Sequence, residues 1–455
     1  MEQPAETRST AQTILLVVAG TLLLVLLLLA GAYWRLTRRS HEELDALVAD
    51  AQALAQRRWP RPSHVDTPTP GTFAQALGPL MPELLRLHKA EPKLDESLAT
   101  KCREVRDGKR PLAELPGECR EALERGRSLM QRTLLTSRTE EAGPPEGLQT
   151  LSDPKHPSAD SGLIALQHIH KLAALDIRFQ LEAGQTEAAL ETCLDGLALG
   201  RDVGHGTGLI GAMVSVSGHN ILFRPCAEAL RRASPTGQKK ATAALRRIRE
   251  GLNPFEMAMR EESIAGPLMS FSRLFDPDQL AALPAGARAT ALHGTPELDV
   301  QIPVFGIPLM RHALIAYRRF EQQHVPLVEL PPSARGARLQ ALHKSMEDSW
   351  NPIVKLAIPD FGKYAARVDE QRAWLDLLLA LALVEQHRAE SGSWPTALPP
   401  LYPERPVVLP TALKLQPDEA DTLRVVPEKA HLEHLEAVLD PEKARLDELL
   451  VTATP

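Results

Sequence analysis

One long apolar run dominates the pattern of hydrophobic and polar positions. Residues 13–32 read TILLVVAGTLLLVLLLLAGA and carry no charge. At 1.5 Å per residue, a helix of this length crosses the hydrocarbon core of a bilayer. Tyr33 and Trp34 follow at once, and amphipathic rings favour the membrane interface. The pattern predicts a transmembrane helix over residues 13–34, preceded by an N-terminal tail over residues 1–12, so the rest of the chain is tethered to a membrane or exported.

Two other interpretations of this run are weaker. The small residues Ala30, Gly31 and Ala32 fit a secretory cleavage site, but the apolar run is longer than the usual core of about 7 to 15 residues in such signals. A processed pilin or pseudopilin would need a glycine before the run and a glutamate just inside it, and neither is present. We therefore expect an uncleaved anchor.

After the anchor, the spacing of apolar positions changes to helical steps of three and four. The clearest case is a stripe that ends before Gly184, followed by Thr186 as a candidate cap and Glu187 as a complement to the next helix dipole. Gly184 and Thr186 thus predict the turn of a helical hairpin. The unit resembles one tetratricopeptide repeat, but no second copy follows at a 34-residue spacing. The stripe of the first helix is Leu166, Ile169, Ala173, Ile177 and Leu181.

Further helices are predicted after this hairpin. Asn253 and Pro254 are typical of a helix start, with Asn253 as the cap. The segment from Trp374 to Val384 is apolar except for Asp376. It is too short for a second membrane span and carries a charge, so it predicts a buried core helix. Aromatic and β-branched residues are scarce, so the fold class is mainly α. The predicted helices cover residues 209–233, 239–251, 309–323 and 369–390.

Turn-rich and proline-rich stretches divide the chain further. Prolines between residues 59 and 71 bar helix and predict a linker, and the polar stretch 137–162 predicts a boundary. Short strand-like pieces between residues 405 and 426 predict a small β-hairpin near the C-terminus. The predicted segments are a juxtamembrane helix and proline-rich linker (35–71), a small helical subdomain (72–137), a main α-helical domain (160–400), and short strands with a C-terminal helix (401–455).

The arginines and the cysteines disagree about the side of the membrane. Arg35, Arg38 and Arg39 follow the anchor and only Arg8 precedes it, which places the large domain in the cytoplasm. Cys102 and Cys119 flank a polar connection and each continues an apolar stripe, so two helices folding back would bring the thiols together. Such a disulfide would persist only in an oxidising compartment, although two separately buried thiols explain the pattern nearly as well. The balance narrowly favours an extracytoplasmic domain.

The other two cysteines predict no special chemistry. Cys193 and Cys226 lie on predicted helices, with no Cys-x-x-Cys and no metal-ligand spacing, and are interpreted as core residues.

One segment resembles a known pattern. Residues 351–359, the following long helix and then GluSerGlySerTrpProThrAlaLeu resemble uncharacterised single-pass bacterial envelope proteins and, more loosely, the turn after the long helix of pseudopilins. Gly392, Trp394 and Pro395 occupy the Gly-x-aromatic-Pro turn, with Leu398 in the short helix after it. The Asp-Pro-Phe and Tyr-Ser-x-Gly endings of that pattern are absent. The resemblance implies a bacterial cell-envelope protein and no particular reaction.

Composition and motifs exclude several functions. The net charge of -6 gives no basic excess, which argues against nucleic-acid binding. Ser152 and Lys155 match Ser-x-x-Lys, but Pro154 and the turn residues around them indicate a loop. ValSerValSerGly (214–218) misses the Gly-x-Ser-x-Gly elbow and lies in a predicted helix. No phosphate loop, HExxH motif or dinucleotide fingerprint occurs, so we expect no cofactor.

Remaining candidate residues have ordinary structural explanations. His168 and His170 lie two apart and face different sides of a helix, and His431 and His434 are only two ligands, too few for a metal site. The pair Glu261 and Glu262, with Met257, Met259 and Met269, could line a groove, but methionine is a common filler of helical cores.

These observations lead to two hypotheses from different classes. The favoured one is a membrane-tethered α-helical interaction or scaffold protein of the bacterial inner membrane, which binds a protein partner and no small molecule. The alternative is an exported or membrane-anchored hydrolase with a dispersed active site. A deep pocket with serine, histidine and acidic side chains would favour the enzyme, and a broad apolar groove would favour binding.

Overall fold

The structure is a computed structural model, and it is mostly helical, which confirms the predicted fold class. It describes residues 10–91, 94–159, 161–293, 306–356, 361–403, 413–417, 423–427 and 451–453. The α-helices are α1 (Thr10–Ala55), α2 (Phe73–Leu77), α3 (Met81–Lys89), α4 (Glu96–Arg106), α5 (Gly117–Leu135), α6 (Gly162–Glu182), α7 (Thr186–Val203), α8 (Gly208–Arg232), α9 (Pro235–Glu250), α10 (Phe255–Ser270), α11 (Pro277–Ala282), α12 (Ala285–His293), α13 (Gly306–His324), α14 (Pro332–Glu347), α15 (Pro352–Leu356) and α16 (Phe361–Ser391).

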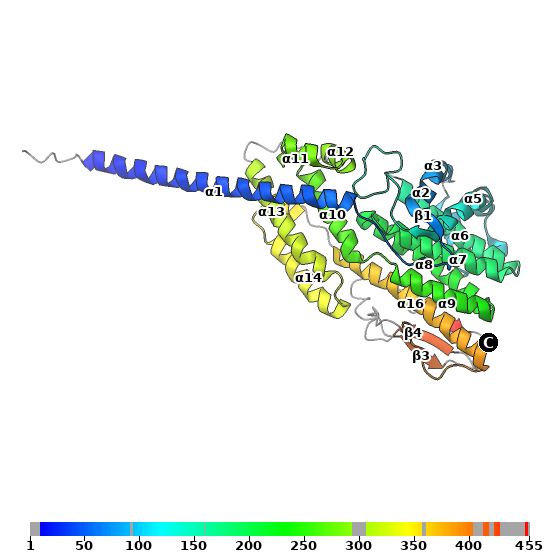
Figure 1. Cartoon of the computed structure of the whole chain (residues 1–455). Coiled ribbons are helices and arrows are strands. Elements are labelled where there is room, and N and C mark those ends of the chain that lie inside the picture. Colours follow the sequence, from blue (N-terminus) through cyan, green and yellow to red (C-terminus); the bar gives the residue numbers. More distant parts are fainter. Residues whose placement is uncertain are drawn as a thin grey trace, which may run out of the picture.

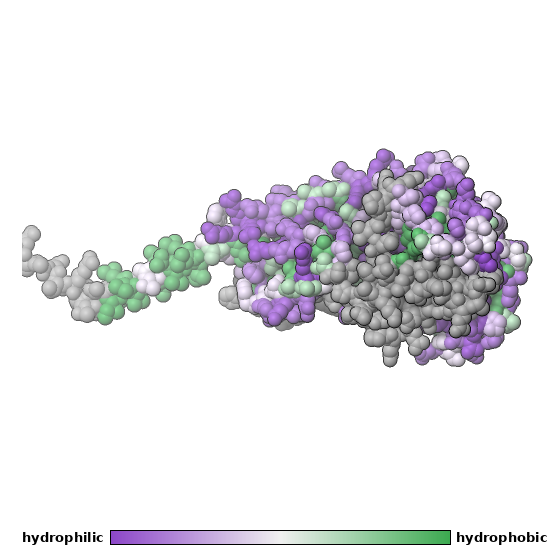
Figure 2. All heavy atoms as spheres, turned by 90° about the horizontal axis from the view of Figure 1, so that it is seen from below, coloured by the Kyte–Doolittle hydropathy of each residue, from purple (hydrophilic) through white to green (hydrophobic). Residues whose placement is uncertain are grey.

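Helix α1 projects from the body as a single rod and then runs into it (Figure 1). Its apolar part is exposed along its length, and Figure 2 shows it as a hydrophobic stem beside a largely hydrophilic body. It is the one helix in the described part of the chain that is long and apolar enough to cross a membrane. The predicted transmembrane and juxtamembrane helices are therefore one continuous element of 46 residues, about 69 Å long at 1.5 Å per residue.

The second half of α1 is amphipathic and belongs to the core of the body. Leu44, Leu47 and Ala51 recur at steps of three and four and are almost fully buried. Against α13, the Arg318 Nη2 lies 2.6 Å from the Asp50 carboxylate, and against α11 the Gln279 Nε2 lies 2.7 Å from Asp45. The apolar segment thus continues into the folded body as one uninterrupted helix.

The proline-rich segment after α1 is also part of the body, so its prediction as a linker is wrong. Arg61 donates to both carboxylate oxygens of Asp202 on α7, at 2.9 and 2.8 Å, and to the Ser137 carbonyl at 3.1 Å. His64 lies 2.8 Å from Asp195 on the same helix. Prolines prevent helix here, but the polar side chains between them attach the segment firmly to α7.

One small sheet lies in the first third of the chain, where the sequence predicts none. Strand β1 (Thr69–Thr72) pairs in parallel with β2 (Thr139–Glu141), with Thr69 opposite Thr139 and Thr72 opposite Glu141. Because β1 has only four residues and contains a proline, it carries no alternating pattern that could reveal it. The sheet joins the predicted linker to the predicted boundary region.

The body has one continuous hydrophobic core rather than two. Buried side chains from Leu44 on α1 to Leu401 after α16 form a single cluster, which includes residues of both predicted domains. Helix α8 packs against α6, α7 and α16, and α5 packs against α6. The stretch 137–162 is therefore a connection across a shared core, and the helices of 72–137 do not form a separate unit.

The predicted helical hairpin is α6 and α7. Gly184 has a φ of +71°. The amide of Gly184 donates to the Leu181 carbonyl at 3.2 Å, and that of Gln185 donates to the Gln180 carbonyl at 2.8 Å, which is the Schellman closure of a helix. The interpretation of Thr186 as a cap is wrong: this tight closure places Gln185 at the cap position and Thr186 at the first helical residue.

Other predicted helix boundaries hold to within a few residues, with two exceptions. Helix α10 begins at Phe255 because the Asn253 side chain donates to the Gly204 carbonyl at 2.8 Å instead of capping the helix. Helix α16 begins eight residues earlier than predicted. Its apolar centre is buried, and Asp376 there accepts from Arg249 at 3.1 Å and from the Tyr402 hydroxyl at 2.6 Å.

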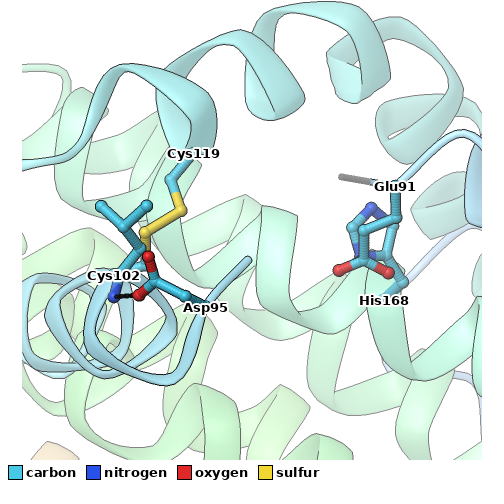
Figure 3. Close-up of a disulfide and its surroundings, with 6 residues drawn as sticks. Glu91, Asp95, Cys102, Cys119 and His168 are labelled. Atoms are coloured by element: carbon cyan, nitrogen blue, oxygen red, sulfur yellow. Dashed lines mark hydrogen bonds and ion pairs between the residues drawn. A yellow bond between two sulfur atoms is a disulfide. The ribbon is translucent and has the colours of Figure 1, made fainter. Parts of the chain in front are cut away.

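All four cysteines of the sequence are paired. Cys102 on α4 and Cys119 on α5 form a disulfide with their Cα atoms 6.4 Å apart (Figure 3). Cys193 and Cys226 are buried, as predicted, but they also form a disulfide, with a Cα separation of 5.4 Å. The interpretation of these two as independent core thiols is wrong because close packing of α7 on α8 brings them together.

Strands also occur near the C-terminus. β3 (Leu413–Pro417) and β4 (Leu423–Pro427) are antiparallel, with Leu415 opposite Val425, and β5 (Val451–Ala453) pairs with β4. The C-terminal helix predicted between residues 428 and 451 lies outside the described residues.

Candidate functional site at the base of the anchor

The residues that the sequence offered for catalysis do not assemble into a site. Ser152 and Lys155 lie in a loop, and the Lys155 side chain is exposed. His168 lies 3.0 Å from Glu91, whereas His170 is buried with its Nδ1 2.9 Å from the Leu166 carbonyl. His431 and His434 lie outside the described residues. Within the described ranges, no group of three or more His, Cys, Asp or Glu side chains could hold a metal ion.

A turn follows α16 as predicted, but the prediction of a short helix around Leu398 is wrong, because residues 395–400 are irregular. Gly392 has a φ of +73°, and its amide donates to the Arg388 carbonyl at 2.8 Å. The Arg388 guanidinium lies 4.2 Å from the centre of the Trp394 ring, and Pro395 is buried. Trp394 therefore fixes the end of the helix and faces no cavity described below.

A polar cavity of about 460 Å³ lies where α1 meets α10 and α13. We call it the junction cavity. It lies at the C-terminal end of α1, the helix that also carries the apolar segment. Figure 1 shows this end of α1 inside the body. It is lined by Asp50, Ala53, Leu54, Arg57, Met257, Arg260, Glu261, Ser263, Ile264, Arg318, Glu321, Gln322, Val325 and Pro326.

Glu261 forms one side of the buried floor. It is 1% exposed and accepts from the Gly208 amide at 2.8 Å and the Thr150 hydroxyl at 3.0 Å, both through Oε2. Gly208 begins α8, so the carboxylate sits at the positive end of a long helix. Its Oε1 has no hydrogen-bond partner among the described residues. Gly208 itself has a φ of +62° and leaves little room for a side chain beside Thr150.

Glu321 forms the other side of the floor. It is 3% exposed, and neither carboxylate oxygen makes a hydrogen bond of ordinary geometry to the described residues. The Tyr317 hydroxyl of the same helix is a hydrogen-bond partner of Glu321, and the charges of Glu262 on α10 and Arg318 on α13 also act on it. A buried carboxyl group with so few partners is costly, and such groups in native proteins call for a ligand, a proton or water.

Burial also changes the ionisation of both floor residues. It raises the pKa of Glu261 to about 7, against the opposing effect of the Gly208 amide. It raises the pKa of Glu321 to about 8 against the opposing effect of the Tyr317 hydrogen bond, and the neighbouring Glu262 adds to the rise. Both groups therefore exchange protons near neutral pH, where a cation could replace the proton.

The arginines at the rim are already engaged. Arg318 lies 2.6 Å from Asp50, Arg260 lies 2.5 Å from Glu256, and Arg57 stacks on Trp59 at 4.3 Å. Asp50 and Arg260 are about half exposed, so the cavity opens to solvent at this rim. Around these three arginines stand six carboxyl groups, namely Glu43, Asp50, Glu256, Glu261, Glu262 and Glu321.

Two further cavities differ from this one. A cavity of about 290 Å³ shares Leu54 and Arg57 with it and extends past Trp59 to Gly206. A cavity of about 350 Å³ lies beside the Cys102–Cys119 disulfide, where Glu91 and His168 face each other (Figure 3). The hydrogen bond from His168 lowers the pKa of Glu91. The acidic group in this last cavity is therefore already paired.

The sequence draws attention to Glu261 and Met257, for which it favours a core interpretation, but no local motif points to Glu321, Asp50 or Arg318. The missed residues come from elements more than 200 positions apart, which no local pattern connects. A usable indication existed: Glu321 continues the buried stripe of Met310, Leu314 and Tyr317 on α13, where an apolar side chain is expected.

Comparisons with protein-family models, with curated proteins and with solved structures find no match for this chain.

Proposed function

We propose that the chain is a single-pass, membrane-tethered binding protein of the bacterial cell envelope, and that its junction cavity receives a basic side chain of a protein partner. The membrane tether is supported by α1 alone among the described helices. The bacterial envelope is implied by the resemblance around Gly392, Trp394 and Pro395.

An extracytoplasmic body is part of this proposal. Disulfides persist in oxidising compartments, and the pairing of all four cysteines supports that side over the cytoplasmic side that the arginine flank favours. The lining of the junction cavity begins at Asp50, about 24 Å along α1 from Trp34, so a partner anchored in the same membrane has to extend that far to reach it.

The observation that carries the proposal is the pair of buried carboxyl groups on the cavity floor. Glu261 Oε1 makes no hydrogen bond to the described residues, Glu321 has only the Tyr317 hydroxyl as a hydrogen-bond partner, and both residues line a space large enough for a side chain. A guanidinium or ammonium group supplies several donors and a positive charge, and it would let both carboxyls ionise. Binding is therefore expected to release protons near neutral pH and to strengthen as pH rises from 6 to 8.5.

Isothermal titration of the full chain in detergent tests this directly. The probe is Nα-acetyl-arginine amide, and its uncharged isostere Nα-acetyl-citrulline amide is the matched control ligand. We expect saturable binding of the arginine probe at pH 8, proton release measured with two buffers of different ionisation enthalpy, and no binding of the citrulline probe.

Variants locate the binding to the cavity. Glu321→Gln and Glu261→Gln should each weaken the arginine probe about tenfold or more, because each removes a charged acceptor. Glu124→Gln on α5 replaces an exposed carboxyl and should change nothing. Equal binding of both probes, or unchanged affinity in the floor variants, would contradict the proposal.

A hydrolase is the second candidate, and one observation favours it. A carboxyl whose pKa lies near 7, as for Glu261, suits general acid–base catalysis. No histidine lines the cavity, however, and the hydroxyl of Ser263 donates to the Arg260 carbonyl. A hydrolase would show turnover that Glu261→Gln abolishes, whereas a binding protein would show probe binding without turnover.

A further inference from the structure

The structure places positive charge on two opposite sides of α1 at the point where the helix leaves the apolar segment. Arg35, Arg38 and Arg39 lie within one turn of each other, and their side chains are exposed. At 100° per residue, these three side chains lie on the side of the helix opposite to Tyr33 and Thr37. On that remaining side, α1 has no basic side chain of its own.

Helix α13 supplies the missing charge. Arg311 lies with its guanidinium 5.7 Å from the centre of the Tyr33 ring and donates to the Thr37 hydroxyl. Tyr33 directly follows the apolar run and therefore marks the expected level of the membrane interface. The two contacts hold the Arg311 side chain at this level, although Arg311 is more than 270 positions away in the sequence. Arg35, Arg38, Arg39 and Arg311 together form what we call the arginine collar.

Little acidic charge balances the collar. Between residue 13 and residue 41 the helix contains no aspartate or glutamate. Glu42 pairs with Arg38 at 3.1 Å, which leaves Arg35, Arg39 and Arg311 as the cations of the collar without an acidic partner in the described part of the chain. The surface of the body around the emerging anchor is hydrophilic (Figure 2).

We propose that the arginine collar binds the headgroup phosphates of anionic phospholipids around α1. Lipids surround a membrane helix on all sides, and guanidinium groups at headgroup level form charge-assisted hydrogen bonds to phosphate. Arg311 belongs to the folded body, so the collar also ties the body to the membrane surface at a second point besides α1 itself.

Native mass spectrometry of the full chain in detergent tests the collar with two lipids of equal chain length, phosphatidylglycerol and phosphatidylcholine. We expect the wild type to retain phosphatidylglycerol in preference to phosphatidylcholine. Arg311→Gln should lower this retention about fivefold, and Arg35→Gln with Arg39→Gln should lower it further. Arg319→Gln, an exposed arginine further along α13, should have no effect.

Two arms separate charge from folding and lipid from free phosphate. Arg311→Lys keeps the charge and should keep most of the retention, so loss in Arg311→Gln alone reports the cation and not a misfolded body. Inorganic phosphate at the lipid concentration should not displace the lipid. Equal retention of the two lipids, unchanged retention in Arg311→Gln, or displacement by phosphate would overturn the proposal.

Discussion

At the scale of single residues, most buried charged side chains of the body form ion pairs. A few, at the floor of the junction cavity, do not. Arg61, Arg201 and Asp202 form a fully buried group in which Arg201 donates to Asp202 at 2.8 Å and to the Pro62 carbonyl at 2.8 Å. Burial acts to raise the pKa of Asp202, but the two guanidinium groups outweigh it and the pKa falls below its ordinary value. For Glu261 and Glu321 the effect of burial is the larger one, and it raises the pKa of both side chains.

Removing the charge of Asp202, the central residue of this group, should detach the proline-rich segment from α7. Asp202→Asn leaves two buried guanidinium groups without a countercharge, and breaking a buried pair in this way costs about 3–5 kcal/mol. Urea unfolding of the full chain in detergent measures the loss. Asp278→Asn on α11 replaces an exposed carboxylate and serves as the control. A loss below about 1 kcal/mol in Asp202→Asn would show that the group is not essential to the fold.

Glu321 should make the body less stable as pH rises. Its pKa is 4.5 in the unfolded chain and about 8 in the fold, so the folded state holds the extra proton between these values. The associated stability is fully present below pH 4.5 and is lost as pH rises through 8, by at most about 5 kcal/mol. Glu321→Gln should therefore unfold at the same temperature as the wild type at pH 5 and at a higher temperature at pH 8.5. A wild type with equal or greater stability at pH 8.5 would contradict the raised pKa.

At the scale of elements, the sequence predicts what local spacing determines. The apolar run predicted the anchor, and the stripe before Gly184 predicted the α6–α7 hairpin and its turn. It did not predict β1 and β2, whose pairing depends on residues about 70 positions apart. Nor did it predict that the proline-rich segment packs on α7, since the attachment consists of isolated polar side chains such as Arg61 and His64.

The turn between α6 and α7 gives a test at this scale. Gly184→Val places a β-branched residue at a φ of +71°, which should cost about 1–2 kcal/mol. No atom lies within 4 Å of the added Cβ, so the cost comes from the backbone conformation and not from a clash. Thermal unfolding measures it, and Gly184→Asn should cost less because asparagine tolerates this conformation. Equal stability of the valine variant and the wild type would contradict the claim that the backbone conformation of Gly184 stabilises the hairpin.

At the scale of the whole molecule, one continuous helix joins the apolar segment to the junction cavity. Asp50, Ala53 and Leu54 of α1 line the cavity together with Arg57, which follows the helix, and α1 also carries the apolar segment. The candidate site could not be predicted from the sequence because its walls come from α1, α10 and α13, which only the tertiary fold brings together. The proposal of an extracytoplasmic compartment, by contrast, is based on two disulfides. The sequence suggested Cys102–Cys119 but not Cys193–Cys226.

Thiol labelling in intact cells tests most directly whether this oxidised body lies outside the cytoplasm. The variant with Cys193→Ser and Cys226→Ser retains only Cys102 and Cys119, which are buried but line a cavity that is open to solvent. The maleimide used is one that does not cross the inner membrane, and labelling of unfolded protein in lysate shows that both thiols can react. We expect no labelling without reductant and labelling of both cysteines after reduction. Free thiols that react only after lysis would place the body in the cytoplasm and contradict the proposed envelope function.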